Sequence, residues 1–289
     1  MYHANLLLTF ALYLSGRLYR TRLIWGLRNS EMDFRHYQSR LRSIVGLSAW
    51  LSRLPEVVVA NSQAGFEYHR RLGFRPSRFY IIDNGVDTLR FAPNEAVRAA
   101  VRLELGVPAE ACVAIMVARV DPMKDHLTLL AALRRAQGLT LLAVGRETET
   151  LTDTPGLHRL GERRDVARLL AASDIFVLSS AFGEGVPNAV LEGMATGLAI
   201  VATDVGDTRR VIGDVGIVVP PRDPAALAAA LVRLSKDPAL RRKYGAAARL
   251  RAETQFSIAR ASAAFDVLID SPSAPGWRWS IIPLAPPSR

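Results

Sequence analysis

Two carboxylates stand eight positions apart around a predicted helix start. Glu184 and Glu192 follow an apolar run at residues 175–178, and Pro187 and Gly197 suit the first turn and the end of a helix. We therefore expect Glu184 in the entry loop and Glu192 within the helix. The free amides of such a helix start favour an anion, usually phosphate. Because carboxylates accept hydrogen bonds from sugar hydroxyls, the pattern predicts a nucleotide-sugar site.

Two cations follow an upstream predicted strand. Residues 112–118 are apolar, Arg119 comes directly after them, and Lys124 stands just before a predicted helix. In open parallel sheets, ligands bind beyond the carboxyl ends of the strands. At such a place, we expect Arg119 and Lys124 to hold a diphosphate and to stabilise the charge that grows on it as it leaves.

Each of these residues also has a structural interpretation. Arg119 pairs with a nearby aspartate, Lys124 is a solvated loop lysine, and Glu184 is a surface carboxylate. Glu192 lies on a mostly apolar helix, where a carboxylate needs a partner. That partner is a backbone amide or an arginine in the structural interpretation, and a ribose in the functional one.

The two segments, in this order, resemble the retaining glycosyltransferases of family 4 (group 1), which have the GT-B fold. Two further segments match the family: the Ile-Asp-Asn-Gly-Val-Asp run at residues 82–87, before Phe91, and residues 199–206. The resemblance extends over residues 56–269 and is strongest over residues 81–221.

The resemblance implies transfer of a hexosyl group from a nucleotide sugar, with uridine diphosphate as the carrier, to a glycan or lipid-linked acceptor. The anomeric configuration is retained, and no side chain acts as a nucleophile. Glu184 then holds hydroxyls of the donor sugar and Glu192 the ribose hydroxyls. The loop that begins at Leu160 runs past the nucleobase, and His3 matches the histidine that the family has near the transferred sugar.

The implied site residues fall into two groups. The expected catalytic residues are Glu184, Arg119, Lys124 and His3. The expected donor-binding residues are Gly185, Val186, Pro187, Asn188, Leu191, Glu192 and Leu160. We expect no metal and no cofactor besides the donor, because the donor half has no Asp-x-Asp triad and no His/Cys cluster with ligand spacing.

Composition agrees with this interpretation. The 289 residues are 49% hydrophobic, which is ample for one large or two modest domains. The single cysteine, Cys112, allows no internal disulfide and suits a reducing compartment. The net charge of +10 suits an anionic donor and an anionic membrane surface. Nucleic acid is not expected as a partner, since no aromatic platform lies among the positive residues.

The apolar opening at residues 4–14 is too short to span a membrane. The preferred interpretation is a helix packed on a sheet. The alternative is an interfacial helix, because Arg17, Arg20 and Arg22 flank it. We accordingly expect a cytoplasmic protein, with peripheral contact at the inner membrane face as the alternative.

Apolar runs alternate with amphipathic stretches along most of the chain, which predicts an α/β fold with doubly wound sheets. The expected strands are near residues 23–27, 57–60, 79–82, 112–118, 139–144, 157–160, 174–179, 199–202 and 216–219, and the expected helices include 38–54, 63–72, 224–234, 239–255 and 258–269. We expect a partial acceptor-side Rossmann-like domain at residues 1–90, a complete donor-side domain at 91–270, and a disordered proline-rich tail at 271–289.

The first domain is about half the length expected for the family. Three hypotheses therefore remain open from the sequence. The first is an active glycosyltransferase in polysaccharide or glycolipid biosynthesis. The second is an inactive or split half that binds the nucleotide sugar. The third, a related GT-B epimerase or phosphorylase, is disfavoured by the Glu-x7-Glu spacing together with Arg119 and Lys124.

Overall fold

The computed structural model describes residues 2–30 and 39–270, so the expected tail lies outside the described residues. Contacts divide the chain into two compact units. The first unit takes residues up to 84, residues 183–186 and residues from 261 onward, and the second takes residues 85–182 and 187–260. We expected one boundary near residue 90. By these contacts the chain passes between the units first at residues 84–85 and again around residues 183–186 and 260–261.

The first unit is built on a three-stranded parallel sheet in the order β1-β2-β3. Its elements are α1 (Tyr2–Leu14), η1 (Leu18–Arg20), β1 (Ile24–Leu27), α2 (Ser39–Leu51), β2 (Val57–Ala60), α3 (Gln63–Arg71), β3 (Arg78–Ile81) and the part of α11 (Ile258–Asp270) from residue 261 onward. In the register, Trp25 pairs with Val58, and Val58 pairs with Phe79.

Helices cover both faces of this sheet, because side chains alternate between faces along a strand. Trp25, Val58 and Ala60 pack against apolar residues of α1 and α2 on one face. Val57 and Val59 pack with Leu268 of α11 on the other. The preferred interpretation of the apolar opening, a helix packed on a sheet, is therefore confirmed.

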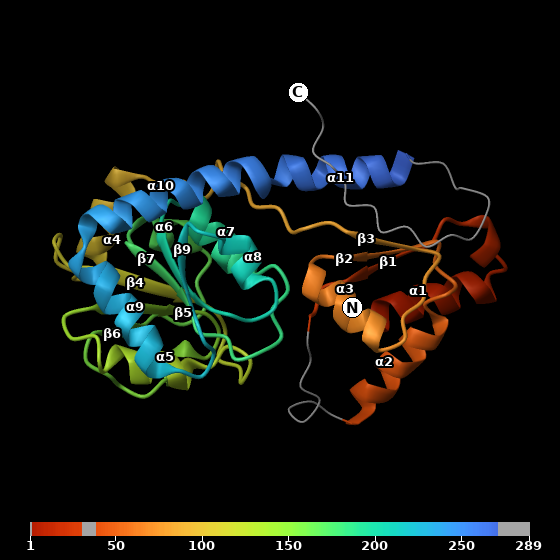
Figure 1. Ribbon diagram of the computed structural model, residues 1–289, viewed down its shortest axis with the longest axis horizontal. Helices are drawn as coiled ribbons and strands as arrows, with labels where there is room; N and C mark the ends of the chain where they lie inside the picture. The colour runs from red at the N-terminus through yellow and green to blue at the C-terminus, as the bar shows by residue number, and fades with distance from the viewer. Residues whose placement is uncertain (1, 31–38, 271–289) are drawn as a thin grey trace. The chain divides into compact units, whose positions relative to one another are not determined.

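The second unit holds a six-stranded parallel sheet in the order β6-β5-β4-β7-β8-β9. Its elements are α4 (Glu95–Glu104), β4 (Val113–Val117), α5 (His126–Leu133), β5 (Thr140–Val144), η3 (Thr148–Thr150), β6 (Leu157–Arg159), α6 (Val166–Ala171), β7 (Ile175–Leu178), α7 (Asn188–Ala195), β8 (Ala199–Thr203), α8 (Thr208–Ile212), β9 (Gly216–Val219), α9 (Pro224–Lys236), α10 (Pro238–Gln255) and the first residues of α11. Helices α5 and α9 cover one face of the sheet, and α6 and α7 cover the other (Figure 1).

The core of the second unit runs along the central strands. All residues of β7 and β8 and all but one of β4 are buried, which is typical of parallel strands covered on both faces. The fold class and every expected strand are confirmed, with ends that differ by at most two residues. Helix α4 was not anticipated. No helix in the described part of the chain has the length and apolarity needed to cross a membrane.

Candidate functional site

The strand order of the second unit creates a switch point between β4 and β7. From β4 the chain moves outward to β5 and β6, and it then returns to β7 and moves outward in the other direction to β8 and β9. The connections that follow β4 and β7 therefore lead in opposite directions from the carboxyl ends of these strands. In open parallel sheets this is where ligands bind.

Arg119 lies in the loop after β4, and its side chain is about half exposed. Its Nη2 atom is 2.8 Å from Oδ2 of Asp121, and its Nε atom donates to the same oxygen at 3.1 Å. Asp121 also accepts a hydrogen bond from the amide of Met123 through Oδ1. The aspartate pairing of the structural interpretation is thus present, and it fixes the direction of the guanidinium at this edge of the sheet.

The loop that carries Lys124 is fastened to the end of β7. The Ser179 hydroxyl lies 2.8 Å from the carbonyl oxygen of Lys124 and 3.1 Å from that of Asp125, so it donates to this pair. The Ala181 amide donates to the Met123 carbonyl at 2.8 Å. Ser179 was not anticipated, although a polar residue directly after an apolar strand was a usable signal. It is fully buried and holds the backbone of Lys124 at the switch point.

Asp125 caps the following helix from an unusual backbone conformation. Its φ of 47° is left-handed, a region that costs most residues free energy. Its carboxylate accepts hydrogen bonds from the amide and the hydroxyl of Thr128, at 3.1 Å and 2.7 Å. These bonds offset the cost and set the turn that leads from Lys124 into α5.

His126, the first residue of α5, was also missed. Its side chain is buried, and neither ring nitrogen has a hydrogen-bond partner among the residues described. Burial lowers the pKa of His126, so the ring is neutral at neutral pH. The sequence carried no clear signal for this, because a histidine at a helix start is commonly exposed.

Helix α7 begins one residue later than expected. Pro187 is its N-cap, and its carbonyl accepts from the amides of Val190 and Leu191. Leu191, another of the expected donor-binding residues, is fully buried in the core. Asn188 is the first helical residue, so its amide is among those without an intrahelical acceptor.

Glu192 lies in the middle of α7 with a half-buried carboxylate. Burial raises its pKa, and the positive charge of Arg90 acts in the opposite direction. Within residues 2–30 and 39–270, no hydrogen bond to this carboxylate is formed. Arg90 is therefore the arginine partner that the structural interpretation requires, but it acts on Glu192 only as a nearby charge. The acceptor positions of the Glu192 carboxylate are therefore unoccupied by these residues.

The segment Glu184 to Val186 belongs by its contacts to the first unit. The Ser30 hydroxyl donates to the Glu184 carbonyl, and Asn84 donates to the Val186 carbonyl at 2.8 Å. A Cβ at Gly185 would stand 3.0 Å from the Ser62 hydroxyl. The Glu184 side chain is buried rather than on the surface.

Leu160 and His3 are the two remaining expected residues. Leu160 follows β6 at the carboxyl edge of the larger sheet, where its amide donates to the Ala143 carbonyl at 2.9 Å. His3 is exposed in the first turn of α1, in the first unit. The second unit therefore brings Arg119, Lys124, Leu160 and Glu192 to one edge of one sheet. No group of three or more His, Cys, Asp or Glu side chains suited to a metal occurs among the described residues.

Both units are layered α/β structures with parallel sheets, and the second has the switch point at which such sheets bind ligands. These features define a chain of the GT-B type. Solved structures agree. Anabaena HepE in complex with UDP is 22% identical with a TM-score of 0.80, and the match covers 94% of this chain and 77% of that chain. WaaG, a glycosyltransferase involved in lipopolysaccharide biosynthesis, is 18% identical with a TM-score of 0.72 over 87% of this chain and 77% of that chain.

Residues 111–237 match the family model described as Glycosyl transferases group 1, so this part of the chain carries a domain of that family. A phosphatidyl-myo-inositol mannosyltransferase of Mycolicibacterium smegmatis is 35% identical over 185 residues, which are 59% of this chain and 46% of that protein. A D-inositol 3-phosphate glycosyltransferase of Streptomyces bingchenggensis is 27% identical over 247 residues, 76% of this chain and 54% of that protein. The chain thus spans about half the length of these curated relatives.

Proposed function

We propose that this chain acts in a retaining hexosyltransferase that moves a sugar from a nucleotide sugar, with uridine diphosphate as the carrier, to a glycan or lipid-linked acceptor in polysaccharide or glycolipid biosynthesis. The observation that carries the proposal is the switch point of the second unit, where Arg119, Lys124 and Glu192 share one edge of the sheet. The alternative is a half that binds the nucleotide sugar without turnover.

Arg119 and Lys124 meet the charge of the departing diphosphate. Asp121 fixes the direction of the Arg119 guanidinium, and Ser179 fixes the backbone at Lys124. Groups held in place before the reaction need no reorganisation as charge develops. Removing one such group commonly raises the barrier by about 2.7–4 kcal/mol.

Glu192 holds the ribose of the donor. Its half-buried carboxylate has acceptor positions to spare, and ribose hydroxyls that donate to it would satisfy a group whose pKa burial raises. The ligand thus supplies the partner that a carboxylate on an apolar helix requires. Asn188 adds a free amide at the helix start, which suits the neighbouring phosphate.

Retention without a protein nucleophile places the acceptor on the same face of the sugar as the leaving group, and the diphosphate takes the acceptor proton. Glu184 and Gly185 contact the transferred sugar in this proposal, and His3 lies near it. No metal or further cofactor takes part. Similar structures favour uridine diphosphate, since HepE was solved with UDP and with UDP-glucose.

Titration calorimetry of the purified chain with uridine, guanosine and adenosine diphosphates, in chelator, tests the donor site. We expect selective binding of the uridine nucleotide. Lys124→Ala and Glu192→Gln should each weaken it by about tenfold or more, because each removes one charge-assisted contact. The matched controls are Lys236→Ala and Glu110→Gln, which make the same changes at exposed positions of the second unit.

Unchanged affinity in both site variants would remove the donor-site assignment, and a strict need for Mg²⁺ or Mn²⁺ would contradict the metal-free mechanism. If the nucleotide binds but no sugar is released from UDP-hexose with any acceptor, the alternative of a binding half holds.

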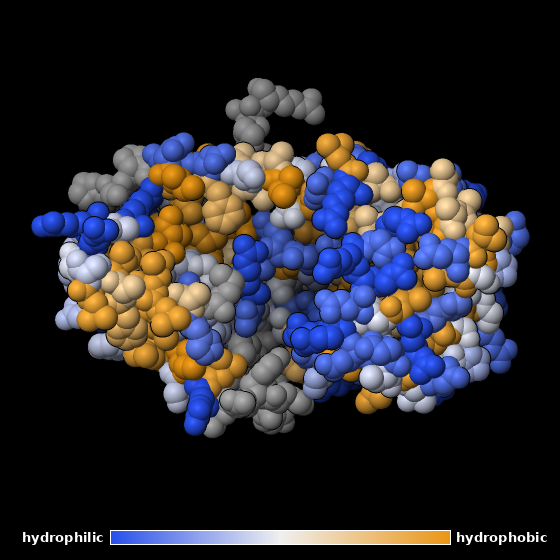
Figure 2. Space-filling view, turned by 180° about the vertical axis from the view of Figure 1, so that it is seen from behind, coloured by the Kyte–Doolittle hydropathy of each residue, from blue (hydrophilic) through white to orange (hydrophobic). Residues whose placement is uncertain are grey.

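We also propose that the first unit contacts an anionic membrane surface at the cytoplasmic face. Large apolar side chains of α1 and α2 point outward, with Leu14 83% exposed and Trp50 72% exposed, and an apolar region covers this unit in Figure 2. Residues 1–84 hold 12 arginines, no lysine and 5 acidic residues, a net charge of 12 − 5 = +7. Outward aromatic and aliphatic side chains beside arginines are typical of an interfacial surface.

Sedimentation with phosphatidylcholine vesicles, with and without phosphatidylglycerol, tests this contact. Binding should require the anionic lipid and weaken several-fold in Leu14→Ser and Trp50→Ser. The control Leu103→Ser alters an equally exposed leucine (84%) on α4 of the second unit and should leave binding unchanged. Loss of self-association in the two variants, without any vesicle binding of the parent chain, would show that a protein covers this face instead.

A further inference from the structure

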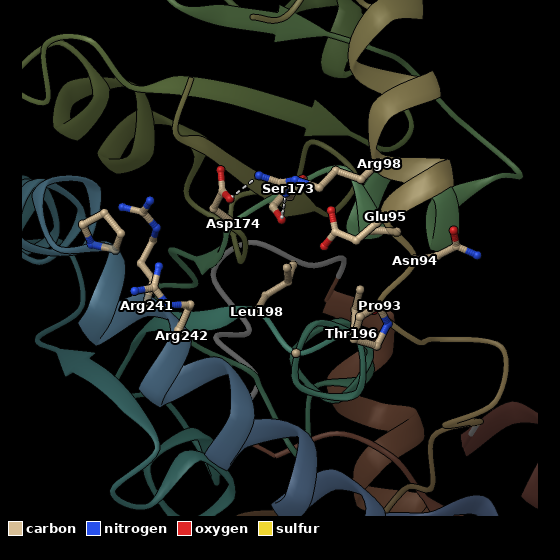
Figure 3. Close-up of a pocket in the computed structure, with 13 residues that line it drawn as sticks. Pro93, Asn94, Glu95, Arg98, Ser173, Asp174, Thr196, Leu198, Arg241 and Arg242 are labelled. Carbon is tan, nitrogen blue, oxygen red and sulfur yellow. Dashed lines mark hydrogen bonds and ion pairs between the residues drawn. The ribbon is translucent and has the colours of Figure 1, made fainter. Parts of the chain in front are cut away.

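The second unit has a cavity at the edge opposite its switch point. Its volume is ≈ 350 Å³, and Asp174 and Leu198, which line it, stand directly before β7 and β8 (Figure 3). The lining is completed by the starts of α4 and α10 and the end of α7. This is the amino edge of the sheet, whereas Arg119, Lys124 and Glu192 serve the carboxyl edge. The cavity therefore has no part in the donor site.

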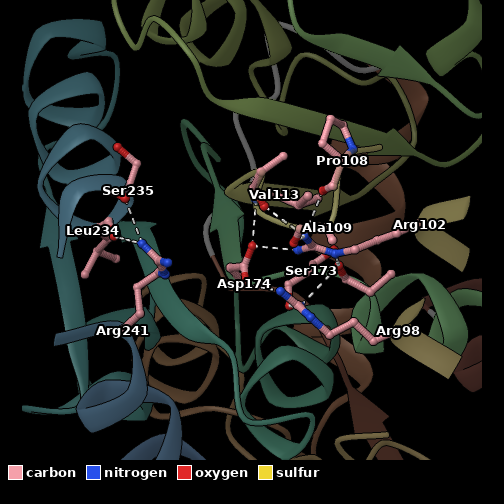
Figure 4. Close-up of polar contacts among 12 residues, drawn as sticks. Arg98, Arg102, Pro108, Ala109, Val113, Ser173, Asp174, Leu234, Ser235 and Arg241 are labelled. Atoms are coloured by element: carbon pink, nitrogen blue, oxygen red, sulfur yellow. Dashed lines mark hydrogen bonds and ion pairs between the residues drawn. The ribbon is translucent and has the colours of Figure 1, made fainter. Parts of the chain in front are cut away.

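Arg98 forms one wall and is held rigidly. Its Nη1 atom donates to the Ser173 carbonyl at 3.0 Å, and its Nη2 atom to Asp174 Oδ1 at 2.7 Å (Figure 4). Behind it, Arg102 donates to the other oxygen of Asp174 at 2.8 Å, and the Val113 amide donates to that oxygen too. One carboxylate thus faces two guanidinium groups, which leaves a positive charge at this wall.

Arg241 and Arg242, from the first turns of α10, stand on the opposite side of the cavity (Figure 3). Arg241 donates through Nη1 to the carbonyls of Leu234 and Ser235, at 2.6 Å and 2.8 Å, which fixes its guanidinium and leaves its Nε and Nη2 donors. Arg242 is exposed and makes no hydrogen bond or ion pair within the described ranges. The start of a long helix, at Pro238, adds its partial positive charge.

Charges of both signs shape the cavity. Arg98, Arg241 and Arg242 with Arg102 behind them outnumber Asp174 and Glu95, so two positive charges are in excess. Glu95 lies beside Arg98, away from α10 (Figure 3). A ligand that fits must therefore carry a compact negative charge on one side and hydrogen-bond donors on the other. The volume is at the small end of ligand sites, which suits a small ligand.

We propose that this cavity binds a small hydroxylated phosphate monoester. The phosphate lies against Arg241 and Arg242, which supply charge-assisted hydrogen bonds, and the hydroxyl groups donate to Glu95. Arg98 contacts the ligand through the donors that Ala172, Ser173 and Asp174 do not use. Arg241 and Arg98 also have structural roles, since one caps the end of α9 and the other joins α4 to β7. Arg242 has no such contact. A substitution of Arg242 therefore tests whether the cavity is a binding site or only a cluster of structural charges.

Titration calorimetry of the full chain with glycerol 3-phosphate tests the proposal, with glycerol as the uncharged probe. We expect saturable binding of glycerol 3-phosphate alone, weakened by added salt. Arg242→Glu should reduce the affinity at least tenfold, about the value of one charge-assisted contact, and Arg242→Lys should retain most of it. Arg233→Glu makes the same charge reversal at an exposed position of α9 outside the cavity and should have little effect.

Lys124→Ala distinguishes this cavity from the donor site. The proposal requires that this variant binds glycerol 3-phosphate as the parent chain does, whatever becomes of nucleotide binding. Binding that is lost in Lys124→Ala and kept in Arg242→Glu would place the phosphate at the carboxyl edge and overturn the proposal. Absence of saturable binding to the folded parent chain would overturn it as well.

Discussion

The two units build parallel sheets from similar sequence patterns but distribute their polar and apolar groups in opposite ways. In the second unit the strands are buried, and charged side chains gather at the two edges of the sheet. In the first, polar side chains of α1, including Asn5 and Thr9, are buried, while Leu7 and Tyr13 on the same helix are exposed. The second unit is therefore suited to small charged ligands, and the first to an extended apolar surface.

Tryptophan fluorescence and cysteine reactivity report on the two units separately. The four tryptophans are Trp25, Trp50, Trp277 and Trp279, so none falls within residues 85–260. With the last two replaced by phenylalanine, tryptophan fluorescence follows the first unit. The single cysteine, Cys112, is half-buried in the second unit, and burial raises the pKa of its thiol to about 11. Its reaction with a thiol reagent follows the second unit.

The largest expected effect is that of Asp174→Ala on the second unit. The change leaves the guanidinium of Arg102, which is 5% exposed, without its carboxylate. Removing one partner of a buried ion pair commonly costs about 3–5 kcal/mol. The free energy of unfolding, measured through Cys112 reactivity in denaturant, should fall by that amount while the tryptophan transition stays in place.

Asp204→Ala is the matched control. Asp204 pairs with Arg209 at 2.7 Å, but both side chains are largely exposed, and such pairs add little stability. Equal losses of unfolding free energy in Asp174→Ala and Asp204→Ala would mean that the buried ion pair at the amino edge stabilises the unit no more than a surface pair does. A loss that appears equally in the fluorescence transition would mean that the two units unfold together, and the comparison would then fail.

Acid should weaken the first unit through His69. This residue is fully buried between Tyr2, whose hydroxyl lies 2.7 Å from Nε2, and the Gly65 carbonyl, 2.6 Å from Nδ1. Nδ1 faces a carbonyl and carries the proton, so the ring is neutral and Nε2 accepts from Tyr2. Burial lowers the pKa of His69 to about 4. The unfolded chain, with a pKa near 6.5, therefore binds the proton first as the pH falls.

The contribution of neutral His69 to the free energy of unfolding is fully present above pH ~6.5. It is lost as the pH falls toward ~4, by about 3 kcal/mol in total. Tryptophan-detected denaturation across this range measures the loss. His69→Gln should be less stable at neutral pH and should show a smaller dependence on pH. The control His158→Gln alters a half-exposed histidine of β6, in the other unit, and should keep the parent profile. An unchanged profile in His69→Gln would assign the acid sensitivity to other groups.

A smaller effect is expected from Thr9→Val, a change of similar shape in α1. The Thr9 hydroxyl accepts a hydrogen bond from Nε1 of Trp25 at 3.0 Å, and both side chains are buried. A buried donor left without an acceptor costs about 1–3 kcal/mol. The tryptophan transition should shift by that amount, and Thr9→Ser, which keeps the acceptor, should lose less. Equal shifts would show that lost packing, not the hydrogen bond, is responsible.

The strands were predictable because each is a short apolar run between turn residues, and burial on both faces of a parallel sheet requires such runs. Helix α4 was missed for a physical reason. The side it turns toward the rest of its unit carries Arg98 and Arg102 beside Val101, and Arg102 is buried. Both arginines form ion pairs with Asp174, which lies more than seventy positions further along the chain. No local sequence pattern contains such a pairing.

The site divides in the same way. Arg119, Lys124 and Glu192 could be placed at one sheet edge because their positions follow from where strands and a helix begin and end. The position of Glu184 and Gly185 could not, since it depends on Ser30, Ser62 and Asn84, which meet that loop only in the folded chain. Whether the three residues at the edge bind a nucleotide stays a prediction.

Glycine at position 245 brings the backbones of two elements into contact. A Cβ there would overlap the carbonyl oxygen of Gly197, which itself has a left-handed φ of 78° just after α7. Main chain, rather than side chains, therefore sets the separation of α10 from the turn that ends α7. An alanine at this single position would therefore force α10 and the turn after α7 apart. The ligand preference proposed for the cavity can thus change by substitution of Arg242, whereas substitution of Gly245 is prevented by the backbone contact.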